Sequence, residues 1–426
     1  MSRSSLNRRD FTRLFAFGGS AAVLSHPSFE GFRPASLSTR SLRPGAVKWD
    51  DVRSQFLMPP DVSVLNAANL CPSPARVLET VVEYTERLDR EPFPSYRTEI
   101  LGAKERTREL LAGFLRVTPE EILITRNTSE ANNWVSNGLD LGPGDEVLIF
   151  SDNHPSNNRA WKAKGERFGY TVREVEQVTP HPGFEYYLEA FERAITVNTR
   201  VMTFMHQSNV AGELFPAKEL CALARDRGII SLIDGAQSFG LLDVDLSDIQ
   251  PDFYSGSAHK WPCGPKETGV LYVNARVQDR FWPSSYSAYS GRSGISRTHE
   301  GMGQRDTPAL LTFGTQIEFL QSIGQGEIEA RSRGLANQLI EGLNAIEGVH
   351  MWTPAEPELR AAVVTFRPGE LDARRVLGAL EEDGIVAAAR GGSDRGGIRF
   401  SPHFYNMEVD IERAIDAIGR YMRQGL

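Results

Sequence analysis

Three features are scarce in this 426-residue sequence: cysteine, an excess of basic charge, and long apolar runs. Cys71, Cys221 and Cys263 are scattered and odd in number, so they exclude a disulfide framework, and without a CxxC pair they indicate no metal site. The formal net charge of −8 argues against nucleic acid as the main partner, because phosphate binding requires a basic face. No apolar run is long enough for an ordinary transmembrane span. With 40% hydrophobic and 24% charged residues, the composition is typical of a globular enzyme with roughly two or three packing units.

The first 45 residues differ in composition from the rest of the chain. They have a basic start, a modest apolar stretch at residues 14–24, and then a Pro- and Ser-rich segment. Residues 7–13, NRRDFTR, resemble a twin-arginine export signal with the arginine pair and the phenylalanine in place, although the first and sixth residues depart from the usual pattern. We therefore expect export of the folded protein to the periplasm through the twin-arginine machinery. The alternative is a disordered basic tail.

From about residue 48 onward, short apolar segments alternate with segments of helical spacing. Near-continuous apolar strands between amphipathic helices are typical of a mostly parallel sheet that is covered on both faces. Ligands of such sheets collect at the carboxyl ends of the strands. The predicted strands are residues 121–125, 146–150, 201–205, 229–233 and 269–273.

A second region follows residue 310. A long helical pattern runs from about residue 315 through residue 343, and a final amphipathic helix is expected at residues 409–422. Strand-like segments lie between them, at residues 361–366 and 397–401. We therefore assign residues 1–45 to the signal and linker, 46–310 to a large domain with an N-terminal arm, and 311–426 to a smaller α/β domain.

Four loops at predicted strand ends carry polar side chains. Thr128 and Ser129 open a helix, where hydroxyls and free N–H groups suit a phosphate, although such residues are usually only caps. His154 follows the second strand, where a lone histidine is more often structural. Asp234 ends an all-apolar strand, and a carboxylate there is costly to bury unless a cation meets it. Lys260, in the sequence SAHK, is expected in a turn just past another strand.

Together these loops offer a phosphate cradle, a group that can stack on a ring, a buried carboxylate and an amine. That set fits pyridoxal 5′-phosphate (PLP). A lysine holds the aldehyde of PLP as a Schiff base, and a carboxylate keeps its pyridine nitrogen protonated. The protonated ring is then an electron sink for chemistry at the substrate Cα.

The sequence DGAQ begins 26 residues before the lysine of SAHK, and this combination is specific. From about residue 60 to its end, the chain resembles the class V aminotransferase family of fold-type I PLP enzymes, which includes cysteine desulfurases and isopenicillin N epimerase. The resemblance implies an α/β fold: a PLP-dependent transferase whose large domain has a mostly parallel seven-stranded sheet, plus a smaller C-terminal α/β domain. It also implies a homodimer.

The resemblance gives roles to the motif residues. Lys260 is similar to the Schiff-base lysine, Asp234 to the partner of the pyridine nitrogen, and His154 to the residue that stacks on the ring; these three are the expected catalytic residues. Gln237 would bond the ring hydroxyl. Gln304, where the family usually has threonine, would reach the phosphate bound by the partner subunit. The expected cofactor-binding set is Thr128, Ser129, His154, Asn209, Asp234, Gln237, Ser257, His259, Lys260 and Gln304.

Two motifs are expected to bind the substrate. Residues 398–406, IRFSPHFYN, match the R-x-S-x-x-x-Y-N segment of the family, in which Arg399 would grip the α-carboxylate with its planar guanidinium. Asn209, in SNVAG, would lie near the cofactor oxygen and the substrate. Cysteine desulfurases need a nucleophilic cysteine shortly before this arginine, but residues 389–396 contain none; their glycines suggest a mobile lid. Cys263 lies in a different loop and is interpreted as a structural thiol.

Export narrows the choice of function within the family. An exported member of this length resembles the periplasmic PLP enzyme of pyoverdine maturation, which converts the chromophore-linked glutamate of the siderophore to succinamide. A pyoverdine precursor is therefore the expected substrate. The alternatives are an epimerase or lyase similar to isopenicillin N epimerase, or a class V aminotransferase for another amino acid. A binding protein without turnover is disfavoured by the intact set of Lys260, Asp234 and Arg399.

Overall fold

The computed structural model describes residues 47–390 and 395–426, which fall in one compact unit. The predicted export signal and most of the predicted glycine lid lie outside the described residues. Within the described ranges, no helix combines the length and the apolar character needed to cross a membrane. The predicted domain boundary at residue 310 stays a prediction.

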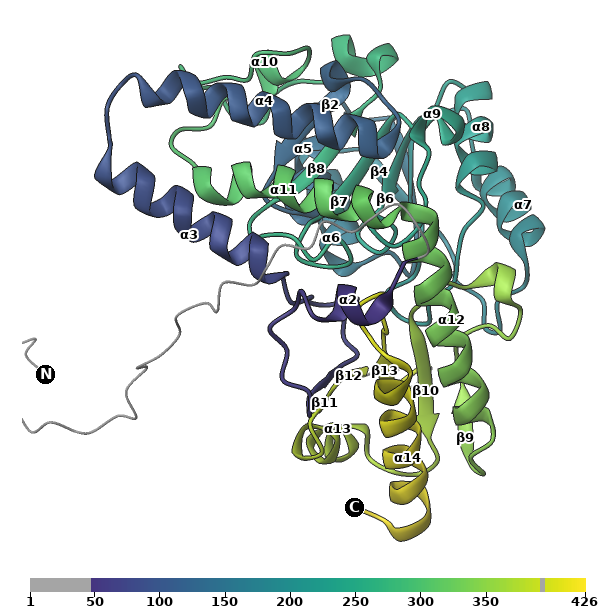
Figure 1. The fold of residues 1–426 in the computed structure, drawn as a ribbon. Coiled ribbons are helices and arrows are strands. Elements are labelled where there is room, and N and C mark those ends of the chain that lie inside the picture. The colour runs from purple at the N-terminus through teal and green to yellow at the C-terminus, as the bar shows by residue number, and fades with distance from the viewer. Residues whose placement is uncertain (1–46, 391–394) are drawn as a thin grey trace, which may run out of the picture. The chain divides into compact units, whose positions relative to one another are not determined.

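A seven-stranded sheet with helices around it forms the larger part of the structure (Figure 1). Its strand order is β2-β8-β7-β6-β5-β3-β4, and β8 alone runs antiparallel to its neighbours. The predicted mostly parallel seven-stranded sheet is therefore confirmed. The strands are β2 (Ile122–Thr125), β3 (Glu146–Phe150), β4 (Thr171–Val175), β5 (Thr199–Met205), β6 (Ile230–Asp234), β7 (Phe253–Ser257) and β8 (Gly269–Val273).

Helices cover both faces of this sheet because successive strand residues point to opposite sides. In β2, Ile122 and Ile124 belong to one hydrophobic core, and Leu123 between them belongs to the other. Figure 1 shows α4 and α11 side by side over the first of these faces. Helices that contribute to the first core include α4 (Tyr96–Leu115), α7 (Phe184–Ala194), α8 (Ala217–Asp226) and α11 (Thr307–Ile323); α5 (Thr128–Gly138) and α6 (Pro155–Phe168) contribute to the other.

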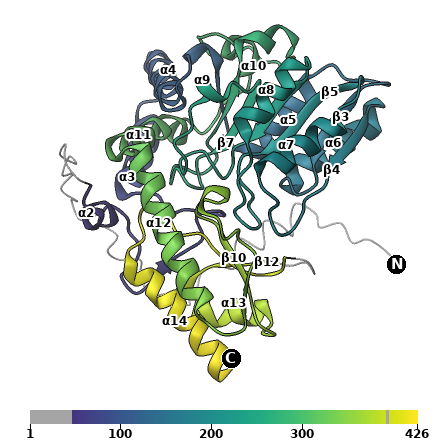
Figure 2. The ribbon, with the colours of Figure 1, turned by 90° about the vertical axis from the view of Figure 1, so that its right-hand side faces the viewer.

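A second, antiparallel sheet has the strand order β12-β13-β10-β9. Figure 2 shows β10 and β12 with α12, α13 and α14 beside them. The strands are β9 (Val349–Met351), β10 (Val364–Pro368), β12 (Ala388–Arg390) and β13 (Gly397–Phe400); the helices are α12 (Gln325–Asn344), α13 (Ala373–Glu382) and α14 (Glu408–Gln424). A short parallel pair, β1 (Ser63–Val64) with β11 (Ile385–Val386), joins the beginning of the described chain to this region.

The remaining helices of the described chain surround these two sheets. They are α2 (Trp49–Arg53), α3 (Ala75–Arg90), α9 (Leu246–Ile249) and α10 (Ser296–His299). The long helical pattern predicted from about residue 315 through residue 343 is divided between two helices, the end of α11 and α12. Gly324 lies between α11 and α12 with φ of +100°, a conformation that glycine adopts without steric cost, so the apolar periodicity continues across a break.

The parallel strands bring the predicted polar loops to one edge of the sheet. β2 ends at Thr125, β6 at Asp234 and β7 at Ser257. The loops with Thr128, Asp234 and Lys260 therefore meet at the carboxyl ends of parallel strands, although the antiparallel β8 lies between β2 and β7. A ligand site is expected at this edge of the sheet.

Candidate active site

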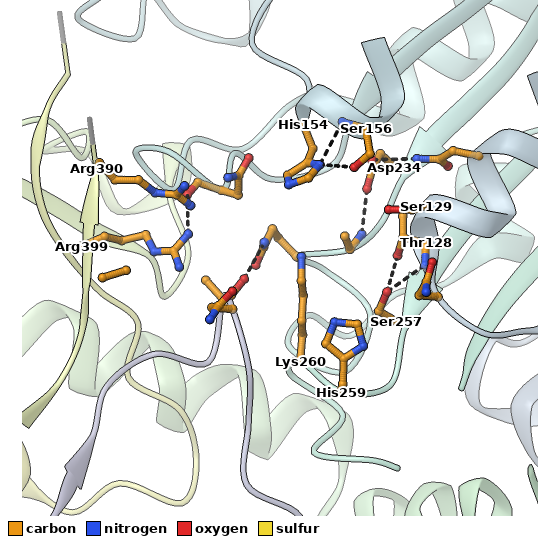
Figure 3. A pocket seen from close by; sticks show the side chains of 18 of the residues that line it. Thr128, Ser129, His154, Ser156, Asp234, Ser257, His259, Lys260, Arg390 and Arg399 are labelled. Carbon is orange, nitrogen blue, oxygen red and sulfur yellow. Dashed lines mark hydrogen bonds between the residues drawn. The ribbon is translucent and has the colours of Figure 1, made fainter. Parts of the chain in front are cut away.

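A cavity of about 500 Å³ lies at this edge, between the strand-end loops and strands β12 and β13 (Figure 3). Nine of the ten predicted cofactor-binding residues line it, together with Arg399. The nine are Thr128, Ser129, His154, Asn209, Asp234, Gln237, Ser257, His259 and Lys260. The structure thus brings together predicted site residues that are as much as 271 positions apart in the sequence, Thr128 and Arg399 being the first and last.

Gln304 is the exception, since it is exposed and is not among the residues that line the cavity. Its neighbour Arg305 donates a hydrogen bond to the carbonyl of Ile124, at a distance of 2.6 Å. The prediction that Gln304 reaches a phosphate bound by a partner subunit concerns a dimer, so it stays a prediction.

The start of α5 forms one end of the cavity. The Asn127 side chain caps this helix by accepting from the Glu130 N–H at 2.9 Å, which leaves the neighbouring hydroxyls for other partners. Both the backbone N–H and the hydroxyl of Thr128 lie 2.8 Å from the Ser257 hydroxyl at the end of β7. Hydroxyls gathered at the positive end of a helix dipole suit a phosphate. Burial, reinforced by Lys260, lowers the pKa of His259 to about 4, so its ring is neutral at pH 7.

Asp234 is 4% exposed and its carboxylate is held by two neutral donors. The Asn132 amide donates to one oxygen at 2.9 Å, and the Ala236 N–H donates to the other at 3.1 Å. Asn132 is itself fixed by the Ser255 hydroxyl, 2.7 Å from its carbonyl oxygen. A buried carboxylate needs a cationic partner, but among the described residues Asp234 has no ion-pair partner. A ligand would have to supply the positive charge. A protonated pyridine nitrogen meets that need.

Asn132 was not predicted as a site residue, although the sequence contains a signal for it. It lies four residues after Thr128 on α5, a spacing that puts two side chains on the same face of a helix. That face turns toward the cavity, which both residues line.

Lys260 lies in the turn after β7, as predicted, and its carbonyl accepts from the Cys263 N–H at 2.8 Å. Burial lowers the pKa of Lys260 and outweighs the opposite effect of the Asp234 carboxylate. A lowered pKa makes the neutral amine accessible, which is the form that attacks a carbonyl carbon.

His154 caps α6 and presents its ring to the cavity (Figure 3). The Ser156 N–H donates to Nδ1 at 3.3 Å, which leaves the ring proton on Nε2. Burial and the nearby Lys260 amine lower the pKa of His154, so a neutral ring faces the place where a planar cofactor would stack.

Gln237 is oriented by two hydrogen bonds. Its amide N–H donates to the Ala68 carbonyl at 3.0 Å, and its oxygen accepts from the Trp261 indole at 2.7 Å. The second N–H of the amide is therefore the donor that remains for a ring hydroxyl, as the resemblance implies.

Arg399 and Asn209 form the other end of the cavity. Arg399 is 2% exposed; it donates to the Asn209 carbonyl at 2.9 Å and to the Asn66 side chain at 3.2 Å. Its Nε is buried without a partner. Arg390 lies beside it, lines the same cavity and was missed from the sequence.

These residues fit PLP. Thr128, Ser129, Ser257 and His259 would hold the phosphate, Asp234 the ring nitrogen and Lys260 the aldehyde carbon. The three cysteines Cys71, Cys221 and Cys263 are buried free thiols, and none of them lines the cavity.

The chain is similar to known proteins over most of its length. The Aminotransferase class-V family model matches residues 64–414. Isopenicillin N epimerase of Amycolatopsis lactamdurans is 30% identical to the chain over 392 residues, which cover 88% of the chain and 98% of that protein. A probable cysteine desulfurase of Methanothermobacter thermautotrophicus is 28% identical over 86% of the chain and 96% of its own length.

A solved structure has the same fold. It is a mutant of C-DES with glycine covalently linked to its PLP cofactor; it superposes with a TM-score of 0.80 over 86% of this chain and 98% of its own, at 24% identity. The match of the family model over most of the sequence agrees with the cavity residues described above. The chain therefore belongs to the class V aminotransferase family of PLP-dependent enzymes.

Proposed function

We propose that this enzyme breaks a bond at the Cα of an α-amino acid whose α-carboxylate is bound by Arg399. The observation that carries the proposal is the buried Arg399 guanidinium in the cavity that also holds Lys260 and Asp234. PLP, when bound, supplies the electron sink for this bond cleavage. Arg399 fixes the carboxylate and thereby the orientation of the bond to be broken. Lys260, with its lowered pKa, moves a proton at Cα.

Desulfuration of cysteine is not the reaction we propose, although cysteine desulfurases are among the relatives. That reaction needs a thiol that reaches the substrate sulfur. Residues 389–396 contain no cysteine, and the buried Cys71 and Cys263 do not line the cavity.

The substrate that we favour is the chromophore-linked glutamate of a pyoverdine precursor, which would be converted to succinamide in the periplasm. Glutamate that is linked through its γ-carboxyl keeps a free α-amine for the cofactor and a free α-carboxylate for Arg399. The resemblance of residues 7–13 to a twin-arginine signal supports export, and we propose that the exported enzyme is a homodimer.

A second candidate is epimerisation, elimination or transamination of another peptide-like amino acid. The 30% identity with isopenicillin N epimerase over nearly its full length favours it. The two candidates share the same chemical requirement at Arg399 and differ in the product formed at Cα.

The test is to incubate the PLP-loaded enzyme with the glutamyl siderophore and with free glutamate at equal concentration, and to read the product masses. We expect the siderophore to react faster, because its remote groups supply binding energy that positions the reacting centre. Arg399→Leu should lower kcat/KM by at least about tenfold through loss of charge-assisted hydrogen bonds, while Arg367→Leu on the exposed side of β10 serves as the matched control. Equal rates for both substrates would instead favour a general amino-acid transaminase.

A further inference from the structure

Arg390 and Arg399 project from adjacent strands onto the same face of the second sheet. Arg399 of β13 lies opposite Ala388 of β12, and Ala388 is two residues before Arg390 in the same strand. Side chains two residues apart in a strand point to the same face, so the two guanidiniums are diagonal neighbours. Both line the cavity, and Figure 3 shows them next to each other.

The two guanidiniums converge on a single acceptor. Arg390 donates to the Asn209 carbonyl oxygen at 2.8 Å, and Arg399 donates to the same oxygen at 2.9 Å. The Nε of each arginine is buried without a hydrogen-bond partner. The neutral Asn209 carbonyl therefore accepts from two guanidinium cations and compensates the charge of neither.

No carboxylate of the described residues forms an ion pair with Arg390 or Arg399. The acid that acts on Arg390 electrostatically is Asp152, and it is already paired with Arg395 at 2.7 Å. Two largely buried cations without counterions are costly, and pairing them with negative or strongly polar oxygens removes that cost. A ligand in the cavity is the remaining source of such oxygens.

The cofactor phosphate and the substrate α-carboxylate together supply an acceptor for only one of the two arginines. The cofactor phosphate belongs at the start of α5, and Figure 3 shows Thr128 and Ser257 on the side of the pocket away from the arginines. The substrate α-carboxylate belongs to Arg399. Arg390 therefore lacks an acceptor from the cofactor or from the α-carboxylate.

We propose that Arg390 binds a carboxyl-derived oxygen at the far end of the substrate side chain, so that the enzyme selects amino acids of the glutamate type. This inference rests on the proposed function, because it takes the α-carboxylate to be on Arg399. The oxygen belongs either to a free carboxylate or to the carbonyl of its amide. Both accept the planar fork of a guanidinium, and the carboxylate binds more tightly because its hydrogen bonds are charge-assisted.

Unreactive acids without an amine test the inference by equilibrium binding. The probes are glutarate with two carboxylates, glutaramate with one carboxylate and one amide, and pentanoate with one carboxylate and a methyl end. Their dissociation constants are measured by calorimetry on the PLP-loaded enzyme. We expect glutarate to bind about 10- to 100-fold more tightly than pentanoate, the factor of one charge-assisted hydrogen bond, with glutaramate between them or equal to glutarate.

The variants identify the residue responsible. Arg390→Met keeps a long side chain without charge and should bring glutarate down to the affinity of pentanoate. Arg390→Lys, which keeps the charge without the fork, should retain part of the difference and is the second variant if the first does not fold. Arg367→Met, at an exposed position on β10 of the same sheet, should keep the full preference.

The outcomes separate this inference from the proposed function. Equal binding of glutarate and pentanoate to the wild-type enzyme, or an unchanged preference in Arg390→Met, would overturn the role of Arg390 and leave Arg399 in place. Failure of all three acids to bind the wild-type enzyme would overturn the carboxylate site at Arg399, and with it both proposals.

Discussion

Replacement of Glu213 by Gln should flatten the dependence of the enzyme's stability on pH. Glu213 follows the loop that carries Asn209, and its side chain is 2% exposed. It accepts from Arg395 at 3.0 Å and from Gln177 at 3.3 Å. Burial outweighs the Arg395 charge and raises the pKa of Glu213 to about 7 from its ordinary value of 4.5.

The sign of the effect follows from proton binding. Between pH 4.5 and pH 7 the folded protein keeps a proton on Glu213 that the unfolded chain has released, so the free energy of unfolding falls as the pH rises through this window. With the two pKa values above, Glu213 contributes a loss of about 2.5 kcal/mol between pH 5 and pH 8. The glutamine of the variant would bind no proton in either state and would contribute nothing to the slope.

The measurement is urea unfolding of the wild-type enzyme and of Glu213→Gln at pH 5 and pH 8. Between pH 5 and pH 8, the free energy of unfolding of the wild-type enzyme should fall by about 2.5 kcal/mol more than that of the variant. The matched control is Glu412→Gln, an exposed carboxylate on α14, which should behave as the wild type. If Glu213→Gln lost more stability than the wild type on going to pH 8, the Arg395 ion pair would outweigh burial and the reasoning would be refuted.

Three further predictions concern the cofactor and export. Borohydride reduction of the PLP-loaded enzyme should fix the cofactor on Lys260, as read by peptide mass mapping, and an adduct on another lysine would contradict the assignment. Asp234→Asn should slow turnover by roughly 100-fold or more while PLP binding, measured by absorption, changes less; turnover at the wild-type rate would count against the role of the carboxylate. Replacement of Arg8 and Arg9 by Lys should keep the protein in the cytoplasm on cell fractionation, and unchanged recovery from the periplasm would indicate another route.

Much of the cofactor end of the site could be predicted because it depends on local sequence. The apolar strands β2, β6 and β7 are short and buried on both faces, and the residue types that end or follow them are informative in themselves. Parallel strands place their carboxyl ends at the same edge of a sheet. Thr128, Asp234 and Lys260 could therefore be assigned to one site without knowledge of the strand order.

Other parts of the site depend on the pairing of distant segments, which the sequence does not state. The role that we propose for Arg390 depends on the register of β12 with β13, because a shift by one residue would turn its side chain to the other face. The contacts of Asn132 and Gln237 likewise depend on β7 and on the Ala68 segment. The break at Gly324 was hidden because the apolar spacing of α11 continues into α12.

The two ends of the cavity are built by different parts of the chain. This division explains why membership of the family identifies the cofactor but not the substrate. Loops of the seven-stranded sheet line the end of the cavity that we assign to the cofactor, whereas Arg390 and Arg399 of the second sheet line the end that we assign to the substrate. Arg390 and Arg399 also donate to the Asn209 carbonyl, and Arg395, shortly before β13, forms ion pairs with Asp152 and Glu213. A change of side chain on the second sheet can therefore alter the substrate while the cofactor contacts stay intact. This is why about 30% identity is enough to assign the cofactor, while the substrate must be argued from Arg390 and Arg399 themselves.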